Sequence, residues 1–213
     1  MIEEVAEIVR KRMGEDVTGH DWWHIERVRT MALRIADKEA RLAPTSDRES
    51  RRGSVDRTVV ELAALMHDLE DHKFGGNDDR IPETIGSILK PLGGDQALIS
   101  QVSETIQTVS FKSASVDTKP TSKEGMIVQD ADRLDAMGAI GIARCFATGA
   151  AIFKRPIYDP TNEAGTSIGH FHEKLLLLKD RLNTASAKRI AEHRHRVLEE
   201  YLKEFHAEWT GEC

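Results

Sequence analysis

The sequence has little cysteine, few aromatic residues and no long hydrophobic run. Only Cys145 and Cys213 occur among its 213 residues, and 5% of the residues are aromatic. Two cysteines are too few for a disulfide framework, so we expect a reducing, cytoplasmic environment. Residues 1–12 alternate charged side chains with isoleucine and valine and contain no unbroken apolar core. We therefore expect neither a signal peptide nor a membrane span, and no membrane partner.

The chain also lacks an excess of positive charge. It has 30 lysines and arginines against 36 aspartates and glutamates, a formal net charge of −6. Phosphate contacts along a polymer need a dense field of basic side chains. The balance argues against a nucleic acid polymer or an anionic membrane as partner. It does not exclude small nucleotides, which need only a local basic patch.

Apolar residues repeat at three and four positions almost everywhere, which is typical of amphipathic helices. Valine, isoleucine and threonine do not cluster with a period of two, so no strand is expected. The fold prediction is therefore all-α. Helices are expected around residues 5–9, 21–41, 58–69, 82–91, 95–109, 125–148, 168–182 and 184–209, with Asp21, Asp95 and Thr184 as caps.

The length predicts a single domain over residues 1–213, since about 100–200 residues per domain is usual. Its core is expected over about 18–150, with C-terminal helices at about 168–210 packed on it. The polar composition of segment 44–57 predicts a surface insert. The long apolar stripe of the last helix leaves open whether it packs within one molecule or across a homodimer.

Two histidines and two aspartates are placed where a metal site could form. His67 and Asp68 end the most apolar helix, where an imidazole and a carboxylate are costly unless they are hydrogen-bonded or bound to metal. His24 and Asp132 each share a helix face with apolar side chains and so point inward. Mixed nitrogen and oxygen donors suit Mn²⁺, Co²⁺, Ni²⁺, Fe²⁺ or Zn²⁺, and suit Mg²⁺ less well. Spacing alone leaves ordinary core histidines as an equal alternative.

Longer motifs surround these residues: GHDWWHIERV at 19–28, ALMHDLEDHKF at 64–74, VQDADRLDA at 128–136, GAIGIAR at 138–144 and HFHEKLL at 170–176. With the order of His24, the pair His67-Asp68 and then Asp132, they resemble the HD-domain metal-dependent phosphohydrolases, which are all-helical. The motifs are most similar to the YpgQ/YedJ-like branch, whose characterised members are nucleotide pyrophosphohydrolases. The resemblance runs from about residue 18 to the end, and the polar insert departs from it.

The resemblance implies a compact HD-domain helical bundle with a metal site in its core cleft. His24, His67, Asp68 and Asp132 would hold one divalent ion, with Mn²⁺ expected first and Mg²⁺, Co²⁺, Ni²⁺, Fe²⁺ or Zn²⁺ as alternatives. The implied reaction converts a nucleoside or deoxynucleoside triphosphate to the monophosphate and pyrophosphate. A metal ion would supply hydroxide near neutral pH and offset charge on the phosphoryl group.

Two acidic residues after the HD pair are candidate catalysts. Asp71 follows Asp68 by three residues and would share its side of a helical turn, so we expect it to orient or deprotonate the attacking water. Glu70 is the second candidate. For both, the alternative is an acidic helix end exposed to solvent.

Substrate phosphates need cations, and Lys73 is the first choice because it lies two residues beyond Asp71. For each basic candidate the alternative is an ordinary surface salt bridge. His20 could contact substrate or orient His24, and His170 resembles a pocket residue of the branch. The full set of expected substrate contacts is Lys73, Lys112, Arg133, Arg27, His20 and His170.

Other functions remain open at this stage. A phosphomonoesterase or a cyclic-nucleotide phosphodiesterase of the same superfamily would use the same ligands, and would differ in whether pyrophosphate is released. A two-metal HD protein would need further histidines between Asp68 and Asp132, where only His72 lies. A non-catalytic nucleotide sensor should have lost a ligand, whereas all four are present.

Overall fold

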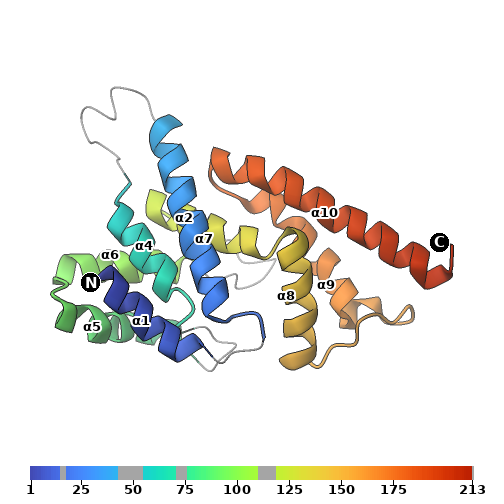
Figure 1. The fold of residues 1–213 in the computed structure, drawn as a ribbon, viewed down its shortest axis with the longest axis horizontal. Coiled ribbons are helices and arrows are strands. Elements are labelled where there is room, and N and C mark those ends of the chain that lie inside the picture. Colours follow the sequence, from blue (N-terminus) through green and yellow to red (C-terminus); the bar gives the residue numbers. More distant parts are fainter. Residues whose placement is uncertain (15–17, 43–54, 71–75, 110–118, 213) are drawn as a thin grey trace. The chain divides into compact units, whose positions relative to one another are not determined.

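The computed structural model describes residues 1–14, 18–42, 55–70, 76–109 and 119–212 (Figure 1). Among these residues every regular element is an α-helix or a 3₁₀ helix, which confirms the all-α prediction. No helix in this part of the chain is long and apolar enough to cross a bilayer. The α-helices are α1 (Ile2–Met13), α2 (Trp22–Leu42), α4 (Arg57–Met66), α5 (Ile81–Leu89), α6 (Gln96–Gln107), α7 (Lys123–Asp135), α8 (Gly138–Ala151), α9 (Ser167–Glu173) and α10 (Ala185–Thr210).

The chain divides into two compact units. The first holds the described residues of 1–16 and 20–132, and the second holds those of 17–19 and 133–213. The expected single domain over the whole chain stays a prediction. The expected insert at 44–57 lies outside the described residues except for its last three.

Helix α4 forms the centre of the first unit. It packs against α1, α2 and α6, and α6 in turn packs against α5. Val60, Leu62 and Leu65 are completely buried, as expected for a central helix dense in valine, leucine and alanine. Asp56 caps the helix by accepting hydrogen bonds from the backbone amides of residues 58 and 59. The helix ends at Met66, three residues before the predicted end, so the HD pair lies in the turn that follows.

The predicted caps are confirmed. Asp21 accepts a 2.8 Å hydrogen bond from the backbone amide of His24, and Asp95 accepts one from the amide of Leu98 at the start of α6. Thr184 caps α10 through the amide of Ala187. Short side-chain oxygens before an apolar stripe therefore marked these helix starts correctly.

The second unit contains α8, α9 and α10, with α8 packed against both others. Phe171 of α9 is fully buried and stacks on Tyr201 of α10 with ring centroids 5.7 Å apart. Asp135 is buried and receives a 3.0 Å hydrogen bond from Arg144, so its charge is paired. This unit supplies its own aromatic core and its own buried ion pair.

One predicted helix, 125–148, is wrong because the chain breaks between α7 and α8. Gly138 has φ of 69°, a left-handed conformation that favours glycine. At Gly141 a β-carbon would lie 2.3 Å from the backbone carbon of Ala136, so the chain also needs a glycine there to turn this closely. Neither requirement shows in the hydrophobic spacing, which continues across the break.

The predicted helix over 168–182 is also wrong beyond its first turns. Helix α9 ends at Glu173, where Lys174 leaves helical geometry with φ of −139°. Two 3₁₀ helices follow, η5 (Leu175–Leu177) and η6 (Lys179–Arg181). Leu175 and Leu178 are buried at a spacing of three, which matches the three residues per turn of a 3₁₀ helix.

Candidate metal centre

Three elements of the first unit bring the predicted metal ligands together. His24 lies in the first turn of α2, His67 and Asp68 follow α4, and Asp132 lies on α7. His24, His67 and Asp68 are buried, whereas the Asp132 side chain is 25% exposed. The cluster therefore has three buried members and one that still contacts solvent.

Four separations between ligand atoms are ones that a shared ion can span, and one atom each of His24, His67 and Asp132 lie within 4.8 Å of one another, as do one atom each of His20, His24 and Asp68. His24 Nε2 is 3.3 Å from Asp68 Oδ2 and 3.6 Å from Asp132 Oδ1. His67 Nε2 is 3.2 Å from Asp68 Oδ1 and 3.9 Å from Asp132 Oδ1. Two atoms that are each about 2.1 Å from one ion lie about 3.0 Å apart at a right angle and about 4.2 Å apart when opposite. All four distances fall within that interval.

Two buried polar atoms of the cluster support a cation rather than a hydrogen-bonded core. Among the described residues, neither His67 Nε2 nor Asp68 Oδ2 has a hydrogen-bond partner. The other ring nitrogen of His67, Nδ1, lies 2.9 Å from the carbonyl oxygen of Ala64 and can donate to it. That bond leaves the lone pair of Nε2 directed at the cluster. An unpartnered buried polar atom costs about 1–3 kcal/mol, so this donor set fits a divalent ion.

Asp68 is charged in its buried position. Burial by itself raises the pKa of this carboxyl, but the positive charge of His67, followed by those of His24 and His20, holds the pKa well below its usual range when these imidazoles are protonated. A metal ligand must be deprotonated to bind, so the cluster presents a carboxylate in the form that a cation requires.

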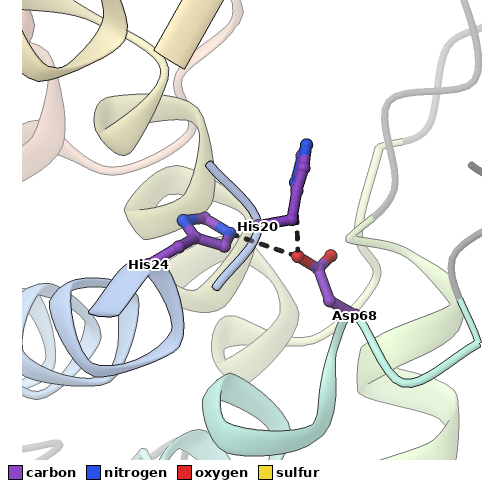
Figure 2. A group of neighbouring side chains, drawn as sticks. All are labelled: His20, His24 and Asp68. Carbon is purple, nitrogen blue, oxygen red and sulfur yellow. Dashed lines mark ion pairs between the residues drawn. The ribbon is translucent and has the colours of Figure 1, made fainter. Parts of the chain in front are cut away.

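His20 joins this cluster, a position that the sequence left open between substrate contact and support of His24. It lies just before α2, and its Nδ1 is 3.8 Å from Asp68 Oδ2. Its ring meets that of His24 edge-to-face, with centroids 5.5 Å apart. Figure 2 shows His20 and His24 approaching the same carboxylate oxygen of Asp68 from different sides.

Glu70, the second catalytic candidate, is buried and tied to neighbouring residues. Its Oε1 accepts a 2.6 Å hydrogen bond from the hydroxyl of Thr84, and its Oε2 accepts a 3.4 Å bond from the backbone amide of Asn77. The alternative of a solvent-exposed helix end is thus wrong for Glu70. Thr84 was not predicted as part of the site. The signal that could have identified it is its position on the same face of α5 as the buried Ile81 and Ile85.

The other predicted contacts are placed as follows. Asp71, Lys73 and Lys112 lie outside the described residues. Arg27 is partly buried on α2. Arg133 is buried and donates to the carbonyl oxygen of Arg181 within the second unit, which accounts for one of its donors.

His170 lies on α9, in the second unit, with its Nδ1 3.4 Å from Glu173 Oε2. Burial, reinforced by the charge of Lys174, lowers the pKa of this imidazole, while Glu173 opposes the shift. His170 is therefore poised to be neutral at neutral pH. Its contact with substrate, like those of the other basic residues, stays a prediction.

Comparison with known proteins gives a consistent set of relatives. The family model of the HD domain matches residues 22–137. The YpgQ protein of Bacillus subtilis (strain 168) is 32% identical over 217 residues, which cover 98% of this chain and 94% of that protein.

Solved structures agree over nearly the whole chain. The crystal structure of Bacillus subtilis YpgQ in complex with ADP is similar with a TM-score of 0.74 and 30% identity, covering 98% of this chain and 97% of that one. An HD-superfamily hydrolase from Bacillus thuringiensis is similar with a TM-score of 0.74 and 37% identity, covering 98% of this chain and 96% of that one.

Proposed function

This chain belongs to the HD domain family and is an HD-superfamily hydrolase; from this membership and the buried cluster, we propose that it is a metal-dependent nucleotide pyrophosphohydrolase. It would convert a nucleoside or deoxynucleoside triphosphate to the monophosphate and pyrophosphate. The observation that carries the proposal is the convergence of His24, His67, Asp68 and Asp132 at ligand-atom separations of 3.2–3.9 Å.

These four side chains would hold one divalent ion, which we propose to be Mn²⁺. The bound ion would lower the pKa of a water molecule and offset charge on a phosphoryl oxygen. The protein prepares the donors for this role. The carbonyl of Ala64 can accept the proton of His67 Nδ1, which leaves Nε2 to bind the ion, and the pKa of Asp68 lies well below its usual range, so this carboxyl is ionised.

A nucleotide is the proposed substrate class because the YpgQ relative was crystallised with ADP and is similar over 98% of this chain. In the proposed reaction, water attacks the α-phosphorus and the bond from this phosphorus to the bridging oxygen breaks. Pyrophosphate leaves with that oxygen. Asp71 would orient the water and accept its proton. Lys73 would offset the charge that develops on the leaving group.

A product assay tests this proposal. The full chain is stripped of metal, reloaded with Mn²⁺ and incubated with a panel of nucleoside and deoxynucleoside triphosphates, and pyrophosphate is separated from orthophosphate. We expect metal-dependent release of pyrophosphate. Orthophosphate release would instead identify a phosphomonoesterase, and no turnover of any nucleotide would favour a sensor.

A matched pair of variants links turnover to the cluster. His67→Ala should abolish turnover, because a cluster that lacks one imidazole no longer holds the ion. His193→Ala should not, because His193 is an exposed residue of α10. Full activity of the His67→Ala protein after reloading with metal would overturn the assigned site.

A further inference from the structure

One face of α8 holds the chain segment that leads into α2. The hydroxyl of Thr148 donates a 2.6 Å hydrogen bond to the carbonyl oxygen of Thr18. Arg144 lies one turn earlier on the same face of α8, and its Nε donates a 2.7 Å bond to the carbonyl oxygen of Gly19. All four residues belong to the second compact unit. Two successive carbonyl groups are thus held by side chains four residues apart on one helix.

The backbone conformation of Gly19 brings this segment against the arginine. Gly19 has φ of 89°, a left-handed conformation that favours glycine. A β-carbon at this position would lie 3.1 Å from Cγ of Arg144, so the chain packs closely on the aliphatic part of that side chain. The Arg144 side chain is 11% exposed, so both the segment and the arginine that holds it have defined places.

The same guanidinium group also binds the end of α7. Its Nη1 donates a 3.0 Å hydrogen bond to Oδ2 of Asp135, whose side chain is buried. The planar guanidinium carries five N–H donors in a fixed arrangement, so one arginine can serve two acceptors at once. Arg144 therefore joins the backbone of Gly19 to the carboxylate of Asp135.

Both of these points are close in sequence to predicted metal ligands. His24 follows Gly19 by five residues, and Asp132 precedes Asp135 by three residues, about one turn of α7. His24 Nε2 and Asp132 Oδ1 lie 3.6 Å apart, so a bound ion would connect the two segments that Arg144 joins. Any freedom that these segments have without the ion must be lost when the ion binds.

We propose that Arg144 is a positioning residue of the metal centre. This inference rests on the proposed metal site and adds to it a residue that does not bind the ion, because a guanidinium group has donors and no acceptor. Arg144 holds the segment before His24 and the segment after Asp132 in place in the metal-free protein. Such preorganisation raises affinity by reducing the conformational freedom that is lost on binding.

The affinity for Mn²⁺ tests the proposal. Isothermal titration is carried out on the metal-stripped full chain of the wild-type protein and of Arg144→Lys. Lysine keeps a positive charge and an aliphatic chain, but its ammonium group does not reproduce the planar arrangement of donors. Loss of a group that supports a metal ligand typically weakens metal binding 10–100-fold. Arg144 acts through the backbone, so we expect the lower end of this range, about a tenfold loss of affinity.

Thr166→Val is the matched control, because it removes buried hydrogen bonds of the same unit at a place that leads to no predicted ligand. The Thr166 hydroxyl donates a 2.6 Å bond to the carbonyl oxygen of Glu163 and accepts a 2.9 Å bond from the amide of Gly169. Both Thr166→Val and Arg144→Lys should lower the Tm of the metal-free protein. Only Arg144→Lys should lower the Mn²⁺ affinity, which separates positioning of the ligands from a general loss of stability.

Equal Mn²⁺ affinities of Arg144→Lys and Thr166→Val would overturn this inference. If the wild-type protein binds Mn²⁺ but releases no pyrophosphate, the proposed function fails, and the ratio of the two affinities still decides the role of Arg144. Failure of the wild-type protein to bind Mn²⁺ would overturn both.

A second variant decides the question if Arg144→Lys fails to fold, as judged by circular dichroism. Thr148→Val removes the other hydrogen bond from α8 to the segment before His24. Because this is a single bond between uncharged groups, we expect an Mn²⁺ affinity about two- to fivefold lower than that of Thr166→Val. Equal affinities of these two variants would then overturn the inference.

Discussion

The hydroxyl of Thr84 donates a 2.6 Å hydrogen bond to Glu70, which ties the residue two positions after the HD pair's aspartate to helix α5. Gly76 lies so close to the same residue that a β-carbon there would be 2.2 Å from the backbone carbon of Glu70. Glu70 and Gly76 thus lie in close contact. Asp71 and Lys73 belong to the sequence between these two residues.

The Thr84 bond should contribute measurably to stability. Thr84→Val keeps the shape of the side chain but leaves a buried carboxylate oxygen without its donor. We expect the free energy of unfolding to fall by about 1–3 kcal/mol. Denaturant unfolding of the metal-free protein measures this change. Thr30→Val alters an exposed threonine of α2 and should change stability by less than about 0.5 kcal/mol. Equal effects of the two substitutions would show that the bond contributes nothing.

The same geometry separates the two catalytic candidates. Glu70→Gln keeps an oxygen that can accept from Thr84, so we expect kcat to stay within a few-fold of wild type. Asp71→Asn removes the proposed base and should lower kcat by about 10²–10⁴-fold. Steady-state kinetics on a triphosphate substrate, with Mn²⁺ binding measured in parallel, distinguishes the two. A larger loss in Glu70→Gln, with metal still bound, would transfer the role to Glu70.

The cluster could be anticipated because its signals are local and chemical. An apolar helix that runs into the pair His67-Asp68 places costly polar groups at the edge of a core. His24 and Asp132 follow inward-facing periodicity on their own helices. The motifs around them supplied the family, which the comparisons confirm. Their ligand roles remain predictions, but their convergence in one unit is an observed property of the fold.

The rest could not be anticipated because it depends on contacts that hydrophobic spacing does not encode. The break between α7 and α8 requires a left-handed backbone conformation at Gly138, whereas the hydrophobic spacing on both sides of it predicts helix. Helix α9 ends at Glu173, and the chain continues in 3₁₀ turns that bury leucines at a spacing of three. His20 was recognised as important without a definite role, because no periodicity relates a residue outside the helix to Asp68.

His170 should titrate below the ordinary value for histidine. Burial lowers its pKa from 6.5, and the charge of Lys174 adds to this shift. The unfolded chain then binds the proton more tightly than the folded one, so stability falls as the pH drops below 6.5. NMR titration of the imidazole, assigned with a His170→Asn variant, measures the pKa. The variant should also lose less stability than wild type between pH 7.5 and pH 5. A pKa at or above 6.5 would contradict this account.

Removal of metal should selectively lower the stability of proteins whose cluster is intact. An ion that binds only the folded state stabilises it by about 2.7 kcal/mol at a concentration 100 times its dissociation constant. For a chain of this size, that energy corresponds to a rise in Tm of about 5–10 °C. We expect this rise when Mn²⁺ is added to the stripped wild-type protein and to His193→Ala.

Asp132→Ala, which loses a carboxylate ligand, should show a much smaller rise, because the ion then binds the folded state only weakly. Differential scanning calorimetry with and without Mn²⁺ makes the comparison. An equal rise in Asp132→Ala and His193→Ala would mean that the stabilising ion binds elsewhere.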